Sequence, residues 1–148
     1  SVTLPSSWGN VTNTSYMFQY CYSLRTINNL EYLGSQTNAS NFTSFLQDAQ
    51  AITGTLTIAS KLSRIGIYGQ SGHNLKCTSI RLTNGTSTWT GSSPQIDVSY
   101  CSLDADALNT LFGDLETVTG KTIKITGNPG ASTCDTSIAT AKGWTVQN

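Results

Sequence analysis

The chain has 148 residues, which is the usual size of one domain with a modest hydrophobic core. It carries eight basic and eight acidic residues, and only 11% of its residues are charged. Because no basic field is present to release counterions, the composition argues against nucleic acid and anionic lipid as partners.

Solubility must come from the uncharged polar residues Ser, Thr, Asn and Gly, which crowd stretches such as LTNGTSTWTGSS. Surfaces of this kind are more common on exported or virion proteins than on cytosolic enzymes. No apolar run is long enough to span a membrane, and no secretory signal opens the chain. Ser1 stands almost inside a strand-like segment, so we expect a processed chain or one that has lost its initiator Met.

Short strand-like segments alternate with helical ones, and Gly, Pro, Asn or Asp stands at most junctions. The clearest helix is 104–115, which Asp104 or Ser102 can cap. Its apolar stripe consists of Leu108, Leu111, Phe112 and Leu115. Two further helices are predicted at 39–50 and 134–142. Strands are predicted at residues 2–4, 24–30, 55–59, 64–68, 79–83, 95–100, 121–126 and 144–147.

Two strands share one pattern, IDVSYC at 96–101 and IKITGN at 123–128, and they stand 27 residues apart. The helix between them predicts a right-handed crossover that joins two adjacent parallel strands, each closed by Cys or Asn. In the first half, an offset of 28 aligns Phe18 with Leu46, Cys21 with Ala49 and Leu24 with Ile52. Units of this length bury their apolar faces by stacking on one another.

These residues resemble a known family. The strand pattern is similar to the leucine-rich repeat, and SSWGNVTNTSYMFQYCYSLRTI resembles the BspA-like subclass. Residues 95–146 resemble closing segments of leucine-rich proteins from bacteria and their phages. The resemblance implies an α/β fold, a small leucine-rich-repeat-like solenoid with a parallel β-sheet on one face and short helices on the other. We expect one domain, 1–148, with repeats at 1–60, an irregular middle at 61–94 and closing repeats with a cap at 95–148.

The middle is irregular because its apolar strand positions, Ile65, Ile80 and Ile96, are only 15 and 16 residues apart, and Leu56 stands only 9 before Ile65. We expect a local hairpin or a degenerate coil there.

Residues with catalytic chemistry have a structural explanation. His73, the only histidine, is expected in an exposed loop. Asp104 and Asp106 fit the first turn of a helix better than a cation site. Asp114 and Glu116 flank the end of that helix, and no motif marks a cleft around them. The sequence therefore predicts no catalytic residue, no cofactor and no metal.

The four cysteines are far apart in the sequence, which argues against a zinc knuckle or a redox pair. They can form disulfides, for which three pairings exist, or remain small buried hydrophobic residues. Stacking of the two similar strands would bring Cys101 close to Cys134, so this pair is the candidate disulfide.

The alternation of the strands predicts an outward face. With Ile96/Val98 and their equivalents pointing inward, Arg81, Asp97 and Lys124 would point outward on neighbouring strands, flanked by Thr83, Ser99 and Thr126. This face is either a charge ladder that serves solubility and register or a docking surface. Trp89, in a polar loop, is a second candidate that would either contact sugars and proteins or pack inward.

The function that these features favour is a non-enzymatic surface interaction module. Composition and the phage-like closing segment favour a virion protein, for capsid decoration or a tail or fibre tip, exposed on the virion surface. Its partners would be virion or cell-surface proteins, and glycans. One alternative is an adhesin domain on the bacterial cell surface. Another is a carbohydrate-active enzyme, which would need two carboxylates across one pocket.

Overall fold

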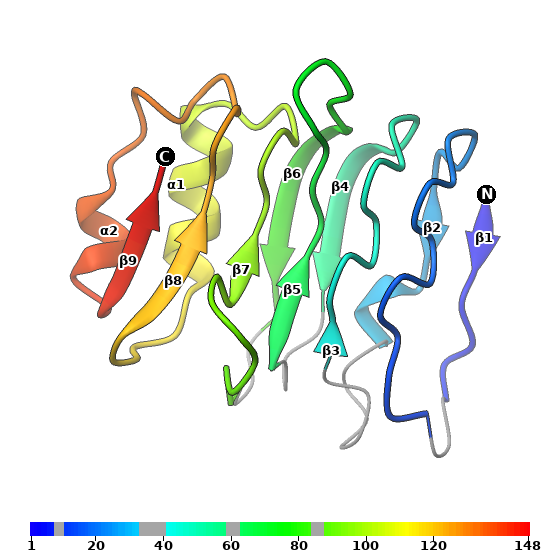
Figure 1. Cartoon of the computed structure of the whole chain (residues 1–148), viewed down its shortest axis with the longest axis horizontal. Helices are drawn as coiled ribbons and strands as arrows, with labels where there is room; N and C mark the ends of the chain where they lie inside the picture. The colour runs from blue at the N-terminus through cyan, green and yellow to red at the C-terminus, as the bar shows by residue number, and fades with distance from the viewer. Residues whose placement is uncertain (8–10, 33–40, 59–62, 84–87) are drawn as a thin grey trace.

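The fold is described from a computed structural model that covers residues 1–7, 11–32, 41–58, 63–83 and 88–148. Within these residues the chain is a mixed α/β structure with parallel sheets, few helices and no closed barrel (Figure 1). The strands are β1 (Val2–Thr3), β2 (Ile27–Asn28), β3 (Asn41–Phe42), β4 (Thr53–Ile58), β5 (Arg64–Gly66), β6 (Lys76–Leu82), β7 (Ile96–Asp97), β8 (Lys121–Lys124) and β9 (Trp144–Gln147). The helices are the 3-10 helix η1 (Leu30–Tyr32), α1 (Ala105–Asp114) and α2 (Ser137–Thr140).

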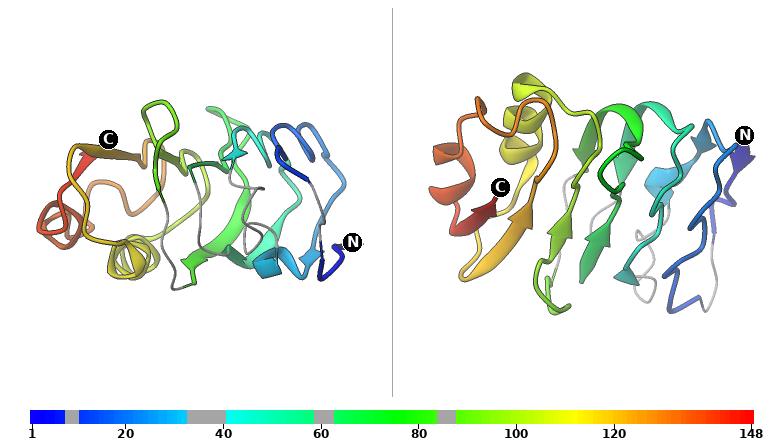
Figure 2. Two further views of the ribbon diagram at one scale, coloured as in Figure 1. Left: turned by 90° about the horizontal axis from the view of Figure 1, so that it is seen from below. Right: turned by 45° about the horizontal axis from the view of Figure 1, so that its top comes forward.

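The described strands form two layers. A five-stranded sheet has the order β3-β5-β7-β8-β9, and every neighbouring pair in it is parallel. The strand pair β4-β6, also parallel, lies in the opposite layer together with α1 and α2 (Figures 1 and 2). The core fills the space between the layers, and β1 pairs with β2 at the N-terminal end.

The predicted pairing of β7 with β8 is confirmed. Ile96 lies level with Ile123 in a parallel register, and α1 belongs to the connection between the two strands. Asp104 caps α1, since its Oδ1 accepts a hydrogen bond from the backbone N–H of Ala107 at 2.8 Å. The apolar stripe of this helix is buried, as predicted.

The offset of 28 in the first half is also confirmed. The N–H groups of Thr14, Tyr16, Phe18 and Tyr20 donate in turn to the carbonyls of Asn41, Thr43, Phe45 and Gln47. In such a parallel ladder, each N–H reaches the carbonyl one place before the residue beside it. Phe18 is therefore level with Leu46, and segment 13–21 lies alongside segment 41–49.

The helix predicted at 39–50 is wrong for its described part. Residues 41–42 form β3, and residues 43–51 form mostly turns. The sequence is misleading because the buried residues have helical spacing; they are Phe42, Phe45, Leu46 and Ala49. Ser44 and Asp48 have φ angles of 50° and 57°, which a right-handed helix does not allow.

The hairpin or degenerate coil expected in the middle is also corrected. Leu56 lies on β4 and Ile65 on β5, and these strands belong to sheets in opposite layers. From β3 to β7, consecutive strands thus alternate between layers, so a short spacing in the sequence does not mean pairing. Within one sheet, Ile65 lies beside Ile96.

The turns after β7 and β8 are each closed by a buried polar side chain. After β8, the Asn128 amide donates to the carbonyls of Val98 and Ile125, and its oxygen accepts from the N–H groups of Cys101 and Leu103. After β7, the thiol of Cys101 takes the equivalent place and donates to the carbonyl of Ile67 at 2.9 Å. The predicted closing role of Cys and Asn is confirmed.

The predicted disulfide between Cys101 and Cys134 is not formed, and all four cysteines are free. Cys101 is fully buried and lies against Cys77, whose thiol donates to the Cys101 carbonyl at 3.3 Å. Cys134 is only partly buried, and its thiol contacts the carbonyl of Ala131. Cys101 points into the core because it occupies the turn-closing position.

Burial raises the pKa of the Cys101 thiol well above its ordinary range, and the neighbouring Cys77 adds to the shift. The folded chain thus holds this proton more tightly than the unfolded chain. The resulting stabilisation is complete below the unfolded thiol's pKa of about 8.5 and is lost as the pH rises through the raised value.

We expect the free energy of unfolding to fall above about pH 8.5, and to fall less steeply in a Cys101→Ser variant. Urea titrations at several pH values check this, with Cys21→Ser as the control; equal pH profiles for both variants would contradict it.

Candidate binding surface

The predicted face of Arg81, Asp97 and Lys124 is only partly assembled. Asp97 and Lys124 lie side by side on β7 and β8, as predicted. Arg81 lies on β6 in the opposite layer, where its guanidinium binds the Asp114 carboxylate through two hydrogen bonds of 2.6 and 2.9 Å. The prediction is wrong for Arg81 because β6 and β7 belong to different sheets.

Thr83 lies beside Arg81 rather than on the five-stranded sheet. Its N–H and hydroxyl both donate to the carbonyl of Ile58 at the end of β4, at 2.9 and 3.3 Å. The prediction that Thr83 lies on the same face as Asp97 and Lys124 is therefore also wrong. A concavity of about 500 Å³ is lined by Arg81, Thr83 and Asp114 with Thr57 and Leu82.

Asp97 and Ser99 are buried rather than presented to a partner. Asp97 is 8% exposed, and its Oδ1 accepts from the N–H and the hydroxyl of Ser99 at 3.0 and 2.6 Å. Asn41 makes the same contacts with Thr43, and Asp135 with Ser137, so this is a local turn that the side chain stabilises. Lys124 and Thr126 are partly exposed, and their binding role stays a prediction.

Trp89 is a core residue. It is 2% exposed, and its ring packs edge-to-face on Trp144 with the centroids 5.2 Å apart. Of the two alternatives for this residue, inward packing is correct, and the exposed binding loop is not. The aromatic residue follows polar Ser and Thr in the sequence, so the local composition gives no sign of its burial.

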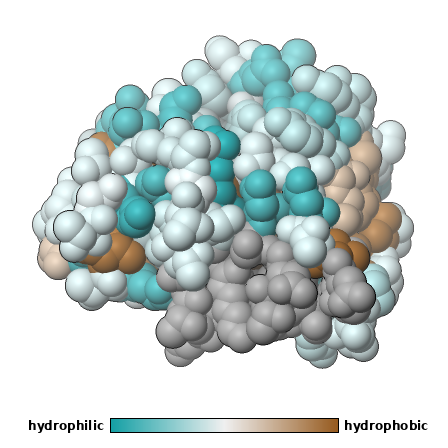
Figure 3. Space-filling view, turned by 60° about the horizontal axis from the view of Figure 1, so that its bottom comes forward, coloured by the Kyte–Doolittle hydropathy of each residue, from teal (hydrophilic) through white to brown (hydrophobic). Residues whose placement is uncertain are grey.

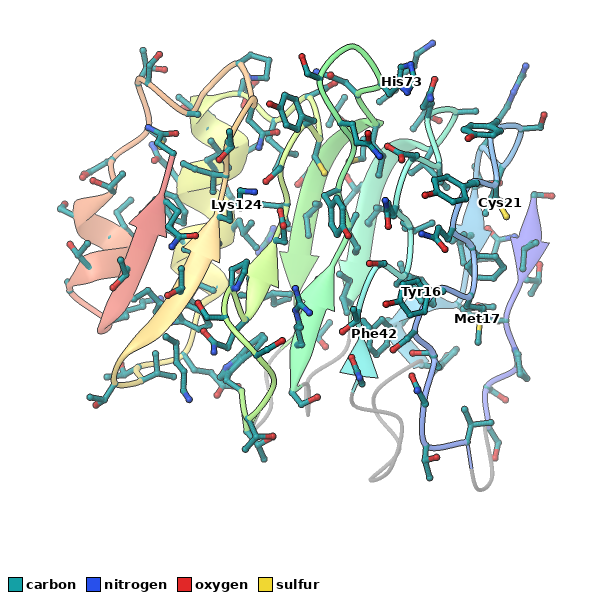
Figure 4. The ribbon with its side chains drawn as sticks, viewed as in Figure 1. Tyr16, Met17, Cys21, Phe42, His73 and Lys124 are labelled. Atoms are coloured by element: carbon teal, nitrogen blue, oxygen red, sulfur yellow. The ribbon has the colours of Figure 1, made fainter. Side chains whose placement is uncertain are left out.

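His73 is exposed in a turn that bridges back to Gln70, as predicted (Figure 4). Asp104 and Asp106 border a concavity of about 310 Å³ at the start of α1. Among the residues that the structure describes, no group of three or more His, Cys, Asp or Glu side chains could hold a metal ion.

Among the described residues, four of the five exposed large hydrophobic and aromatic side chains lie along one segment that the sequence did not single out as a site, and the fifth is Tyr32 on η1. We call these residues the tyrosine patch: Tyr16 (56% exposed), Met17 (37%), Tyr20 (47%) and Tyr22 (58%). The rings of Tyr20 and Tyr22 lie 6.1 Å apart and are inclined by 30°. Figure 4 shows Tyr16 and Met17 on the N-terminal side of Phe42, away from Lys124. The spacing of tyrosines in YMFQYCY could have indicated the patch, because Phe18 and Cys21 alternate with them toward the interior.

Two tyrosines of the patch adopt a backbone conformation that is unfavourable for a bulky residue. Tyr16 and Tyr20 have φ angles of 62° and 58°. Their equivalents in the next segment are Ser44 and Asp48, which share the positive φ. A non-glycine residue held there costs on the order of 1–3 kcal/mol, and the recurrence at Ser44 and Asp48 indicates that the shared turns of the two segments impose this conformation.

The patch rests on hydrogen-bonded side chains from two neighbouring segments. Gln19 donates to the Gln47 oxygen at 2.8 Å, and the Tyr68 hydroxyl donates to the same oxygen at 3.3 Å. The Tyr68 hydroxyl also bonds Ser44 at 2.7 Å. These contacts fix the polar side chains beside the exposed rings, so these polar side chains have little conformational entropy left to lose on binding.

A groove of about 470 Å³ begins at Tyr22. Its walls come from four successive parts of the chain, and its polar groups are Gln50, Asn74, Lys76 and Ser102. An aromatic ring beside amide, hydroxyl and ammonium groups can contact both proteins and sugars.

Comparisons with protein-family models, with curated proteins and with solved structures found no match to this chain. In the described part of the chain, no helix is long and apolar enough to cross a membrane.

Proposed function

We propose that the chain is a non-enzymatic interaction module that binds a partner through the tyrosine patch and the adjoining groove. The single observation that carries this proposal is the exposure of three tyrosines, two of them held at positive φ, on a hydrogen-bonded base. Exposed aromatic residues on a rigid surface supply large contact area at low entropic cost, and they are enriched at binding sites.

The same proposal includes the architecture. The parallel register of segments 13–21 and 41–49, and of β7 and β8, supports a leucine-rich-repeat-like solenoid of the BspA-like kind. The recurrence of positive φ at Tyr16 and Ser44, and again at Tyr20 and Asp48, supports it too.

As to its setting, the polar, uncharged composition supports a virion protein that decorates a capsid or forms a tail or fibre tip and binds a protein or host surface. The alternative is an adhesin domain on a bacterial cell surface. A carbohydrate-active enzyme is the rival of a different class, and cleavage of a bound glycan would identify it.

The test replaces Tyr16 by Ser and Tyr20 by Asn, because Ser stands at the equivalent position 44 and Asn tolerates positive φ. We expect this double variant to keep its thermal stability and to lose retention on undecorated particles or host cells about tenfold or more, as expected for aromatic anchor residues. Retention is measured by co-sedimentation.

Two control variants distinguish the tyrosine patch from the other exposed surfaces. Tyr32→Ser removes an exposed tyrosine from η1, and Lys124→Glu alters the sheet face; both should leave retention unchanged. Full retention of the Tyr16/Tyr20 variant would contradict the proposal, and loss with Lys124→Glu alone would move the site to the sheet face.

A further inference from the structure

We propose that the edge of segment 13–21 at the N-terminal end of the molecule binds an extended polypeptide segment, which adds beside it in a parallel register. This inference concerns backbone groups and partly buried apolar side chains, so it does not depend on the function of the tyrosine patch.

The internal contact between segments 13–21 and 41–49 shows how such a segment binds. Alternate N–H groups, from Thr14 to Tyr20, donate to four carbonyls of segment 41–49 at 2.9–3.3 Å. The Thr14 hydroxyl adds a bond of 2.9 Å to the Asn41 carbonyl. The rings of Phe18 and Phe45 pack edge-to-face with their centroids 5.3 Å apart.

In the part of the chain that the structure describes, the opposite edge of segment 13–21 presents the same array of carbonyls without a donor. The equivalents of the four accepting carbonyls are those of Asn13, Ser15, Met17 and Gln19. No backbone or side-chain group among the described residues donates to them. Four acceptors are thus arranged as they are where segment 41–49 receives its neighbour.

The apolar side chains at this edge are also incompletely covered. Phe18 and Cys21 are only partly buried, whereas their equivalents Leu46 and Ala49 are 0% exposed. Leu46 and Ala49 have neighbouring segments on both sides, whereas Phe18 and Cys21 have a described neighbour on one side only. Figure 3 shows hydrophobic residues gathered at this end of the molecule. An added segment would bury Phe18 and Cys21, just as segment 13–21 covers Leu46 and Ala49.

The hydrogen-bonding groups of the edge determine what it can bind. The N–H groups of Met17, Gln19 and Cys21 are used within the segment, on the carbonyls of Thr14, Tyr16 and Phe18. The edge therefore offers acceptors and few donors, and two copies of it cannot pair with each other. The partner must supply an N–H at every second residue and an apolar side chain over Phe18, as the sequence of residues 14–20 itself does.

The experiment uses the chain's own segment as the probe. A fluorescently labelled peptide of residues 13–24, carrying Cys21→Ser, is titrated with the whole protein and followed by anisotropy. The matched control peptide is N-methylated at its Tyr16 and Phe18 positions, which removes two donors and keeps the side chains. We expect saturable binding of the first peptide and at least about tenfold weaker binding of the second, since the second lacks two of the four hydrogen-bond donors.

Equal binding of both peptides, or no binding of either, would overturn the proposal. The Tyr16→Ser, Tyr20→Asn variant of the protein should bind the peptide as the wild type does, which separates this edge from the tyrosine patch. Sedimentation of the protein alone tests whether a second copy of the protein, rather than a separate segment, occupies the edge. Self-association that excess peptide reverses would make a second copy the occupant and overturn the assignment to a separate segment.

Discussion

A chain with Val98→Asp is expected to remain unfolded in buffer. Val98 is fully buried; its N–H donates to the Lys124 carbonyl, and its carbonyl accepts from Asn128. An unpaired charge at this position costs several kcal/mol or more, which is comparable with the whole stability of about 5–15 kcal/mol of a small domain.

Circular dichroism and urea unfolding measure this effect. The matched control is Thr145→Asp, which places the same charge at an exposed position of β9 and should leave the unfolding midpoint nearly unchanged. A soluble Val98→Asp protein with the melting temperature of the wild type would show that the inner and outer faces of β7 are reversed.

Replacement of Asn128 by Ala is expected to lower the free energy of unfolding by about 3–5 kcal/mol. The amide is 6% exposed and makes two hydrogen bonds as donor and two as acceptor, at 2.7–3.0 Å. Its removal leaves buried backbone groups without partners, at about 1–3 kcal/mol for each group that water cannot reach.

Asn128→Asp gives a graded control, since it keeps the accepting oxygen and loses the donated bonds. We expect its stability at neutral pH to fall below that of the wild type as well. Urea titrations of the three proteins measure the differences. A loss of less than about 1 kcal/mol for Asn128→Ala would mean that water replaces the amide and that the turn does not depend on it.

The sequence predicted the part of the fold that depends on local chemistry. The spacing of Ile96 and Ile123, the cap at Asp104 and the apolar stripe of α1 each follow from a short-range rule, and each is confirmed. The offset between Phe18 and Leu46 was also readable, because stacked segments need matching apolar positions.

The sequence did not reveal which layer each strand joins. Arg81 and Asp97 stand on strands with the same alternation, but β6 and β7 lie in opposite layers, and only long-range pairing decides this. The same reason explains Trp89, whose burial depends on Trp144, far along the chain. Helical spacing of Phe42, Phe45, Leu46 and Ala49 also arises from successive turns, so periodicity alone could not distinguish them.

The tyrosine patch was not predicted, because the outward face was inferred from charged residues. In a chain with few charges, exposure of Tyr16 and Tyr20 depends on which side of segment 13–21 faces the core, and the apolar Phe18 and Cys21 between the tyrosines are the sequence signal for that side.

Hydroxyl-radical footprinting of the chain bound to particles or host cells tests the proposed binding surface most directly. Oxidation of Tyr16, Met17, Tyr20 and Tyr22, which are exposed in the free protein, is followed by mass spectrometry with and without the partner. We expect protection of these residues on binding, with the oxidation of Tyr32 and His73 unchanged. Unchanged oxidation of the tyrosine patch in the bound state, with protection elsewhere, would contradict it.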